Sequence, residues 1–260
     1  MKDITVVKIG GSTFGSGDTT IEDIVALQKK GVALIVVHGG GSTVTDWLKK
    51  QGGTTKFVRG ERVTDLPTLQ IAAAVLSGLV NKEITAAINL KGGRAVGISG
   101  VDGALIESRV KDKEMGWVGS VEKVNAGVLE SLLKAGFIPV VSPISLLSID
   151  RTADAPEIIN VNGDPVAGEI AAAVGAKRLV FLTDVAGVSN KAGRLISRLS
   201  APQAEAMIAK GEISGGMIPK VGACLRALAA GATARIIDGR TEHALAREVE
   251  GVGGGTTIVK

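Results

Sequence analysis

Short runs rich in Val and Ile alternate along the chain with longer amphipathic runs rich in Ala and Leu. This alternation is typical of a mainly parallel β-sheet that carries helices on both faces. The apolar runs predict strands at residues 4–9, 33–37, 95–99, 137–142, 178–183, 234–237 and 256–259. The amphipathic runs predict helices at residues 21–30, 44–51, 66–89, 125–135, 165–174, 202–210 and 220–230. We therefore expect an α/β fold.

Three segments interrupt this rhythm. Residues 57–63 and 105–121 have the pattern of hairpins, which could edge the sheet or cover a site. Residues 148–157 are polar and end in an Ala-Pro pair, so we expect a loop. A boundary falls near Gly175, where a predicted helix ends. At 260 residues, the chain can form one large domain or two lobes around a cleft.

The composition narrows the class of ligand. Hydrophobic residues make up 45% of the chain, enough for a sizeable core, whereas aromatic residues make up 2% and Tyr is absent. Few side chains are therefore suited to stacking on single-stranded nucleic acid. The formal net charge of +4 is scattered along the chain. We expect an enzyme that acts on small anionic molecules and has no nucleic-acid partner.

Cysteine usage and the N-terminal pattern bear on the compartment. Cys224 is the only cysteine, which excludes an internal disulfide and a cysteine-ligated zinc site. The first residues, MKDITVVKIGG, enter a strand without the pattern of a signal peptide. No apolar run reaches the ~18 residues that a membrane span requires. We expect a cytoplasmic protein without a membrane partner.

The segment LIVVHGGGST places His38 and three glycines directly after a buried strand. Such a turn can supply the oxyanion donors of a serine hydrolase, or its backbone amides can close around an anionic substrate at the edge of a sheet. The hydrolase also needs a GxSxG elbow, and the nearest match, GISGV, lacks the final glycine. GxxxxGK[ST] and GxGxxG loops are absent as well. The substrate-binding interpretation is favoured, and any nucleotide requires a different loop.

Several polar side chains lie at the ends of the predicted strands and helices. Lys8 interrupts the apolar run VVKIGG, where burying an unpaired ammonium is costly, although a solvated strand lysine is the alternative. Lys220 stands near the start of a predicted helix, where an ordinary exposed lysine would also fit. Asp164 precedes Pro165 and has a purely structural explanation as a helix N-cap.

Two further side chains suit the recognition of a carboxylate. Asn160, in IINVNGDP, could hydrogen-bond a ligand carboxylate or amide. Arg62, in RGERVTD, stands at a predicted hairpin end, and its planar guanidinium suits bidentate carboxylate binding. A solvated arginine is the alternative for Arg62.

Taken together, seven segments resemble the amino acid kinase family, and within it the acetylglutamate kinase group. They are VVKIGG, VVHGGG, GERVTD, LVNK, NVNGD, LTDVAGV and GGMIPKV, in the family's order. Each segment alone is a weak signal, but the ordered set covers practically the whole chain. The resemblance implies the amino acid kinase fold, a three-layer αβα arrangement with an open, mainly parallel sheet and two lobes around a central cleft.

The resemblance also implies roles in catalysis and acceptor binding. Lys8 and Lys220 match the two lysines that stabilise the transferring phosphoryl group, and Asp164 matches the carboxylate that orients them. The acceptor-binding residues implied by the resemblance are Gly40 and Gly41, whose amides face the acyl-amino acid, and Arg62 and Asn160, which hold its α-carboxylate.

On the nucleotide side, the resemblance implies that Gly10 and Gly11 form the turn beside the phosphates. It implies a wall for adenine and ribose made of Asp184, Val185, Ala186, Gly187, Val188 and Ser189 with Glu212, Ile213 and Ser214. The family uses ATP with Mg²⁺, held mainly by the nucleotide phosphates, so we expect no set of protein metal ligands.

The implied activity is ATP-dependent phosphorylation of the γ-carboxylate of N-acetyl-L-glutamate, the second step of arginine biosynthesis. The nucleophile is already ionised at neutral pH, so positioning and positive charge do most of the work and no general base is required. A single domain, residues 1–260, is expected, with an acceptor-binding and dimerising N-lobe, 1–175, and an ATP-binding C-lobe, 176–260.

Departures from the family pattern leave alternatives open. Arg59 stands where acetylglutamate kinases commonly carry Asn, and Val101 stands where many carry Lys. The second departure is also compatible with kinases that act on carrier-protein-linked aminoadipate or glutamate in lysine biosynthesis. A non-catalytic nucleotide- or oxyanion-binding member of the fold is a third alternative. The glycines after His243 differ from the effector loop of arginine-inhibited hexamers, so we expect a homodimer that arginine does not inhibit.

Overall fold

The computed structural model describes residues 3–10, 19–58 and 60–260. Its strands are β1 (Thr5–Ile9), β2 (Leu34–His38), β3 (Phe57–Val58), β4 (Glu61–Arg62), β5 (Ala95–Gly100), β6 (Ile106–Val110), β7 (Val118–Val124), β8 (Ile138–Leu147), β9 (Ile158–Val161), β10 (Arg178–Thr183), β11 (Arg198–Ser200), β12 (Thr233–Asp238) and β13 (Thr256–Val259). The α-helices are α1 (Thr20–Lys29), α2 (Gly41–Lys50), α3 (Leu66–Ala73), α4 (Asn81–Leu90), α5 (Ala126–Lys134), α6 (Gly163–Ala173), α7 (Ala201–Ala209), α8 (Met217–Ala229) and α9 (Ala244–Val249).

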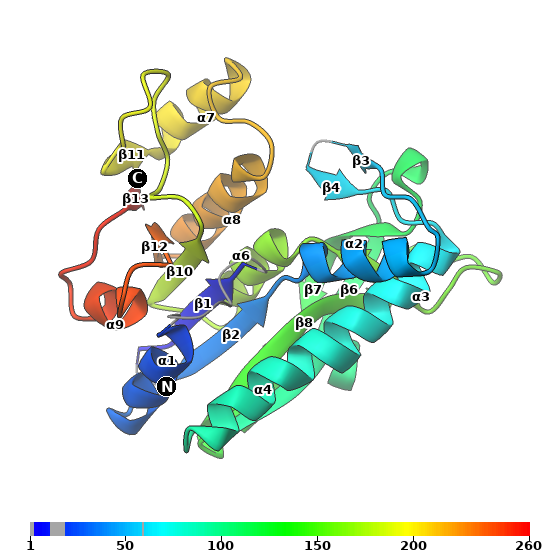
Figure 1. Ribbon diagram of the computed structural model, residues 1–260, viewed down its shortest axis with the longest axis horizontal. Coiled ribbons are helices and arrows are strands. Elements are labelled where there is room, and N and C mark those ends of the chain that lie inside the picture. Colours follow the sequence, from blue (N-terminus) through cyan, green and yellow to red (C-terminus); the bar gives the residue numbers. More distant parts are fainter. Residues whose placement is uncertain (1–2, 11–18, 59) are drawn as a thin grey trace.

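One large sheet forms the middle layer. Its order is β11-β13-β12-β10-β1-β2-β8-β6-β7-β9, with β5 also paired to β8, and β3 pairs with β4 in a separate hairpin (Figure 1). The central strands β12, β10, β1, β2, β8 and β5 run parallel to one another, and antiparallel pairs occur toward both edges. Since parallel strands end at the same edge, the residues after β1, β2 and β10 lie side by side.

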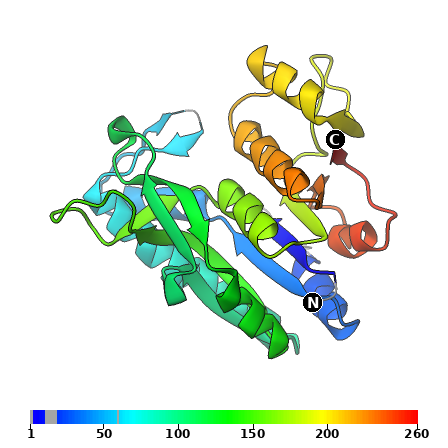
Figure 2. The same cartoon turned by 180° about the vertical axis from the view of Figure 1, so that it is seen from behind.

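Helices cover both faces of this sheet, as Figures 1 and 2 show from opposite sides. Helices α1, α2, α4 and α9 contribute to one apolar core, and α5, α6, α7 and α8 contribute to the other. The three-layer α/β architecture expected from the alternating pattern is therefore confirmed, and the sheet runs without interruption from β2 through β1 to β10 across the boundary predicted near Gly175.

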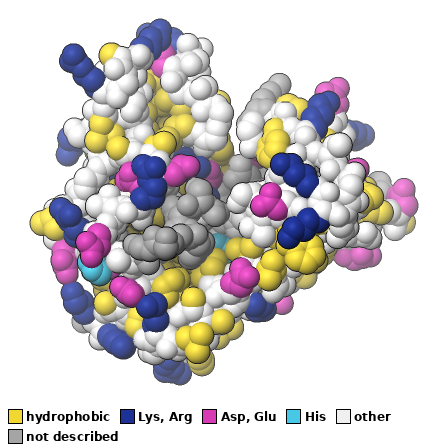
Figure 3. Space-filling view, viewed as in Figure 1, with side chains coloured by type: hydrophobic (Ala, Val, Ile, Leu, Met, Phe, Trp, Pro, Cys, Tyr) yellow, Lys and Arg dark blue, Asp and Glu magenta, His cyan; other side chains and the backbone are white. Residues whose placement is uncertain are grey.

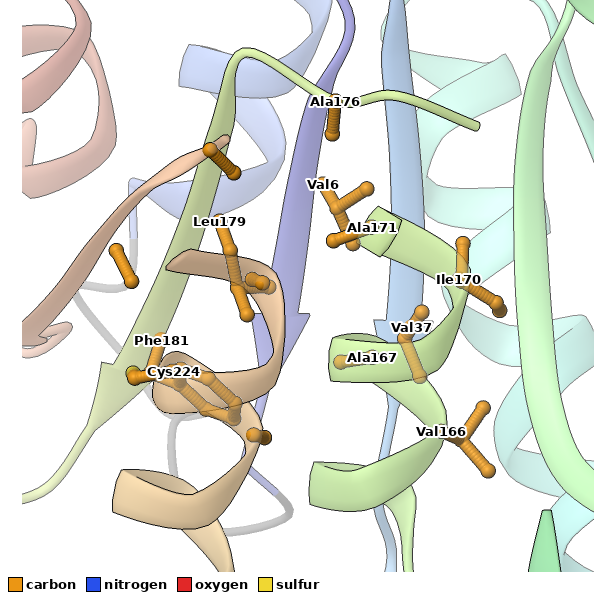
Figure 4. Close-up of a cluster of buried hydrophobic side chains, with 14 of the residues drawn as sticks. Val6, Val37, Val166, Ala167, Ile170, Ala171, Ala176, Leu179, Phe181 and Cys224 are labelled. Atoms are coloured by element: carbon orange, nitrogen blue, oxygen red, sulfur yellow. The ribbon is translucent and has the colours of Figure 1, made fainter. Parts of the chain in front are cut away.

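Helices α6 and α8 cross closely above β1, β2 and β10 (Figure 4). A Cβ atom at Gly168 of α6 would lie 2.8 Å from Cα of Ala223 in α8. Glycine is therefore required at this crossing, because any side chain would push the two helices apart. The crossing matters for the site described below, because Asp164 lies on α6 and Lys220 lies on α8.

A continuous helical segment, Leu66–Leu90, runs along the other face of the sheet. It consists of α3, the π-helical stretch η1 (Ala74–Val80) and α4, and by length and composition it could cross a membrane. In this fold it is a layer of the domain, since Leu69, Val75 and Ile88 are buried in the core. The expectation that no segment reaches membrane-span length is therefore wrong for this helix, which the sequence pattern predicted as a single α-helix.

The seven predicted strands and seven predicted helices are all present, with shifted ends. Both predicted hairpins are confirmed, as β3–β4 and β6–β7, and residues 148–157 form no strand or helix. The pattern failed to predict β9, β11 and α9, which contain four, three and six residues, respectively.

Candidate active site

A cavity of about 320 Å³ opens at the carboxyl edge of the central strands. The cavity wall includes the end of β1, the glycines after β2, the β3–β4 hairpin, the β9–α6 connection and the first turn of α8. Figure 3 shows the surface hollowed between the side that carries this hairpin and the side that carries α7 and α8. Among the residues predicted from the sequence, the lining contains Lys8, Gly10, Gly40, Gly41, Arg62, Asn160, Asp164, Asp184 and Lys220.

Three charged side chains meet at the floor of this cavity. Lys8 Nζ lies 2.6 Å from Asp164 Oδ1, and Lys220 Nζ lies 2.8 Å from Asp164 Oδ2. Burial by itself would raise the pKa of Asp164, but the ammonium groups of Lys8 and Lys220 outweigh it and hold that pKa below its ordinary value. The carboxylate therefore stays ionised at neutral pH, and the group of three carries an excess of one positive charge.

The start of α6 brings Asp164 beneath β1 and β2. Gly163 allows this approach, since a Cβ atom there would lie 3.2 Å from the His38 carbonyl and 3.6 Å from Lys8 Cε. The N-cap of α6 is Asn162, whose side chain accepts a hydrogen bond from the Asp164 amide at 2.9 Å. The structural explanation of Asp164 as N-cap is therefore wrong, and its carboxylate is directed to the two lysines.

The glycines after β2 form the turn into α2. Gly40 has a φ of 144° and packs so closely that a Cβ atom would lie 2.8 Å from Leu76 Cδ2. Gly41 is the first residue of α2, and the first amides of a helix have no partner within it and attract anions. A glycine turn that can close around an anion is therefore present at the cavity.

His38 ends β2 and is completely buried. Its Nδ1 lies 2.7 Å from the Gly39 carbonyl, and its Nε2 lies 3.1 Å from Asn81 Nδ2. Nδ1 therefore donates and Nε2 accepts. Burial lowers the pKa of His38 to about 4, so the ring is neutral at physiological pH. Through these two hydrogen bonds the neutral ring holds the start of the glycine turn in place.

Arg62, the last residue of β4, lies in the cavity wall formed by the β3–β4 hairpin. Its Nη2 donates to the Gly41 carbonyl at 2.6 Å and to Thr45 Oγ1 at 2.8 Å, and its guanidinium stacks over the Phe57 ring, 4.8 Å from the centroid. Nη1 is buried and has no hydrogen-bond partner among the described residues. Burial also lowers the pKa of Arg62. A buried guanidinium without a carboxylate partner from the described chain indicates a binding place for an anion.

Asn160 approaches the cavity from β9. Its Nδ2 lies 3.3 Å from Thr64 Oγ1, and the Thr64 hydroxyl in turn donates to the Arg62 carbonyl at 2.9 Å. The residues predicted to hold an acceptor carboxylate are thus brought together by one hydrogen-bonded wall.

The residues predicted to bind the nucleotide are more dispersed. Gly10 and Asp184 line the cavity, and the Asp184 carboxylate accepts a hydrogen bond from Thr183 Oγ1 at 3.2 Å. Gly11 lies outside the described residues. The other members of the predicted wall lie outside the lining: Val185, Ala186, Ser189 and Ser214 at the surface, Gly187 packed against Thr256, Val188 and Ile213 in the core, and Glu212 in an ion pair with Lys191.

Several lining residues were not predicted. Asn162 and Thr183 adjoin predicted residues at the ends of β9 and β10, a position that could have identified them. Phe57 and Leu76 come from the hairpin and the π-helical stretch, and no local pattern indicates that they face the same cavity.

Comparison with known proteins gives one consistent family. A profile of the amino acid kinase family matches residues 3–238. The chain is 50% identical over 256 residues to the acetylglutamate kinase of Dehalococcoides mccartyi, covering 98% of this chain and 94% of the relative. It is 46% identical over 261 residues to the acetylglutamate kinase of Cereibacter sphaeroides, covering 99% of this chain and 87% of the relative.

Solved structures share the fold. A protein from Streptococcus mutans UA159 matches with a TM-score of 0.83 and 26% identity, covering 100% of this chain and 99% of that one. Carbamate kinase from Giardia lamblia bound to AMP-PNP matches with a TM-score of 0.71 and 15% identity, covering 99% of this chain and 98% of that one. The second identity is low enough that this likeness concerns the fold alone.

Proposed function

The chain belongs to the amino acid kinase family, and on that premise we propose that it phosphorylates the γ-carboxylate of N-acetyl-L-glutamate with ATP, the second step of arginine biosynthesis. The observation that carries this proposal is the group of two lysines and one aspartate that faces a cavity lined by an arginine whose Nη1 has no hydrogen-bond partner among the described residues. Relatives that cover nearly the whole chain at 46–50% identity have the same activity in their names.

The charges suit transfer of a phosphoryl group between two anions. Lys8 and Lys220 offset the repulsion between the acceptor carboxylate and the triphosphate, and they stabilise the charge on the equatorial oxygens of the transferring group. Asp164 keeps both ammonium groups in place before the substrates arrive, because it contacts one through each carboxylate oxygen. The acceptor needs no base, since a carboxylic acid is ionised at neutral pH.

The acceptor is proposed to lie between the glycine turn and the hairpin. Arg62 Nη1 and the Asn160 amide would hold its α-carboxylate, and the amides of Gly40 and Gly41 would face its reacting carboxylate. Val44, Ala72 and Leu76 give the same cavity an aliphatic side, which suits an acyl group. These contacts support an acylated amino acid over a free one, whose ammonium would meet Arg62 and two lysines.

The nucleotide is proposed to approach from the opposite side, along Gly10 and residues 184–189 and 212–214. Within the described residues, no group of three His, Cys, Asp or Glu side chains could hold a metal ion, and the Asp164 oxygens already contact lysines. We therefore propose that Mg²⁺ enters as part of the substrate MgATP and is held by the phosphates.

The proposed lobes, 1–175 and 176–260, meet at the ion pair between Asp164 and Lys220. The acceptor wall and Asp164 belong to the first segment, whereas Lys220 and the proposed nucleotide wall belong to the second. Binding of both substrates would therefore align the two segments through the Lys220–Asp164 contact.

We also propose a cytoplasmic homodimer that arginine does not inhibit. Support for the dimer comes from the long helical segment Leu66–Leu90, which leaves apolar surface that a second copy of the chain could cover. Only 39% of its most apolar 18-residue stretch is buried, and Leu66 and Leu90 are 48% and 87% exposed. Light scattering after size-exclusion chromatography measures the oligomeric state. A sharp fall in activity at millimolar arginine would refute the insensitivity.

An acceptor panel tests the function directly. Purified protein with MgATP and hydroxylamine should form a hydroxamate with N-acetyl-L-glutamate and release equimolar ADP. Faster turnover with carrier-linked aminoadipate would instead support the lysine-pathway alternative, and nucleotide binding without turnover on any acceptor would support a non-catalytic member.

A further inference from the structure

A second cavity of about 650 Å³ lies between the β6–β7 connection and the loop that follows β8. It is lined by Arg109, Val110, Lys111, Asp112, Lys113, Gly116 and Trp117 from the first segment and by Leu147, Ile149, Asp150, Arg151, Thr152 and Ala155 from the second. It shares no lining residue with the active-site cavity. Its size falls within the range of small-molecule sites, roughly 300–1,000 Å³.

The floor of this second cavity is apolar. Leu147 and Ala155 are buried there, and Val110 and Trp117 pack in part against the main core. Trp117 is one of only two tryptophans in a chain whose aromatic content is 2%. An indole and aliphatic side chains together suit the flat apolar body of a ligand.

The rim of the second cavity carries four basic and two acidic residues, and three of the basic residues form ion pairs with carboxylates. Arg109 pairs with Glu122 at 3.2 Å, Lys111 with Glu61 at 2.6 Å and Arg151 with Glu157 at 2.9 Å. Lys113 is the one rim cation whose ammonium makes no ion pair with the described residues. Lys113 is therefore the rim group that can pair with a negative charge on a ligand.

Hydrogen bonds fasten this cavity to the acceptor wall. The Trp117 amide donates to the Thr64 carbonyl at 2.7 Å, and the Thr64 amide donates to the Met115 carbonyl at 2.9 Å. The Asn160 amide donates to the Trp117 carbonyl at 3.1 Å. Trp117 is thus bonded on both sides to segments that bear acceptor-binding residues.

Two further contacts make the connection stiff. Gly116, with a φ of 69°, lies so close to Thr64 that a Cβ atom would be 2.4 Å from its carbonyl oxygen. The ion pair between Lys111 and Glu61 joins the rim to the residue that precedes Arg62 in β4. A ligand that shifts Trp117 or competes for Lys111 would therefore move the acceptor wall.

We propose that this second cavity is a ligand site for an organic anion with a flat apolar body, and that its occupancy changes acceptor affinity at the active site. The binding part stands on the cavity alone, whereas the coupling to acceptor affinity rests on the proposed function.

The probe is 8-anilino-1-naphthalenesulfonate, an anion with this shape. A Trp47→Phe variant leaves Trp117 as the only tryptophan, so energy transfer to the bound probe reports its distance from this cavity. We expect saturable binding of one probe per chain, with energy transfer from Trp117 and no displacement by saturating MgATP and acceptor. Displacement by the substrates, or binding without transfer, would overturn the proposed site.

Charge reversal at the rim tests whether the probe binds in this cavity. Lys113→Glu should weaken probe binding roughly tenfold, because an attraction becomes a repulsion. Lys49→Glu, at an exposed lysine on the last turn of α2, is the matched control and should leave the affinity unchanged. Equal effects of the two variants, or none from either, would contradict the assignment.

The coupling is measured as the KM of the acceptor with and without probe. We expect the KM to change severalfold while kcat changes less, and the change to disappear in Lys113→Glu. An unchanged KM at saturating probe would contradict the coupling, whereas the proposed binding site would stand. Should the protein show no kinase activity, calorimetric titration of N-acetyl-L-glutamate with and without probe still tests the coupling.

Discussion

Two groups of paired charges lie in different parts of this molecule, and they differ in the ratio of cations to anions. In the active site, Asp164 is shared by Lys8 and Lys220, so two cations face one anion. Near the C-terminus, Arg235 of β12 pairs with Glu248 of α9 at 2.9 Å and also donates to Thr257 and to the carbonyls of Gly253 and Gly254. One cation there faces one anion and further acceptors.

The difference separates a charge group that can bind a ligand from one that only joins parts of the fold. The arginine pair joins β12, β13 and α9, and its two charges balance each other. The two lysines cannot both be neutralised by Asp164, and the excess charge is directed into a cavity. Burying such an excess costs free energy unless an anion is bound, so the imbalance marks a ligand site, whereas the balanced pair marks a structural joint.

Removal of either lysine should have the largest effect. Lys8→Ala and Lys220→Ala should each lower kcat on the order of 10²–10³-fold, because a preorganised positive charge is lost from the transition state. Acceptor affinity, measured by calorimetry, should fall far less, and the midpoint of thermal unfolding should hold, since Asp164 keeps one cation. Equal losses in turnover and acceptor binding would contradict a transition-state role.

Arg235→Met should show the opposite pattern. It leaves Glu248, which is 9% exposed, without its cation, and breaking a buried pair in this way costs about 3–5 kcal/mol in the free energy of unfolding. Urea denaturation measures this loss, and kcat of the folded fraction should stay close to the original value. Arg240→Met is the matched control, because the Arg240–Asp238 pair lies at the surface, where solvent screens it, and its loss should change the free energy of unfolding little.

The helix crossing that aligns the charges should be the next most sensitive point. In Gly168→Ala, the new Cβ atom would meet Ala223 at 2.8 Å and push α6, with Asp164, away from α8. We expect a loss of ~1–3 kcal/mol in stability and a roughly 10- to 100-fold fall in kcat/KM.

Gly222→Ala in α8 is the control for this crossing, because a Cβ atom there meets nothing within 4 Å. It should keep full activity and gain up to about 1 kcal/mol in stability from higher helix propensity. Similar losses in the two variants would show that helix composition, and not the crossing, is responsible.

The sequence pattern sufficed for the sheet because its central strands are buried on both faces. β1 and β2 are buried at every position, so they stand out as apolar runs, interrupted in β1 only by Lys8 after its first residue, Thr5. β9, which pairs with both β7 and β8, and β11, at one edge of the sheet, mix buried and more exposed positions over four and three residues. Such short strands are defined by their neighbours and give no local signal of their own.

The site was predictable where one residue acts from the end of one element. Lys8, Asp164 and Lys220 are of this kind, because Lys8 lies near the end of a recognisable strand and the other two lie in the first turn of a recognisable helix. The position of the Arg62 guanidinium depends on Phe57, Gly41 and Thr45, which only the folded chain brings together.

The smallest expected effect concerns a third ion pair, exposed on one side, between His243 and the buried Asp23 of α1. His243 Nδ1 lies 2.7 Å from Asp23 Oδ1, and this hydrogen bond and charge raise the pKa of His243. A raised pKa in the folded state means that protonated His243 stabilises the fold. The contribution is complete below the unfolded pKa of about 6.5 and is lost as the pH rises through the folded value.

The free energy of unfolding of the original protein should therefore fall as the pH rises from the unfolded pKa of His243 through its folded pKa. In His243→Gln the fall should be absent, because the other histidine, His38, with a pKa of about 4, stays neutral throughout. Urea denaturation at a series of pH values measures the difference, and an unchanged slope in His243→Gln would show that the Asp23 contact is not what links stability to pH.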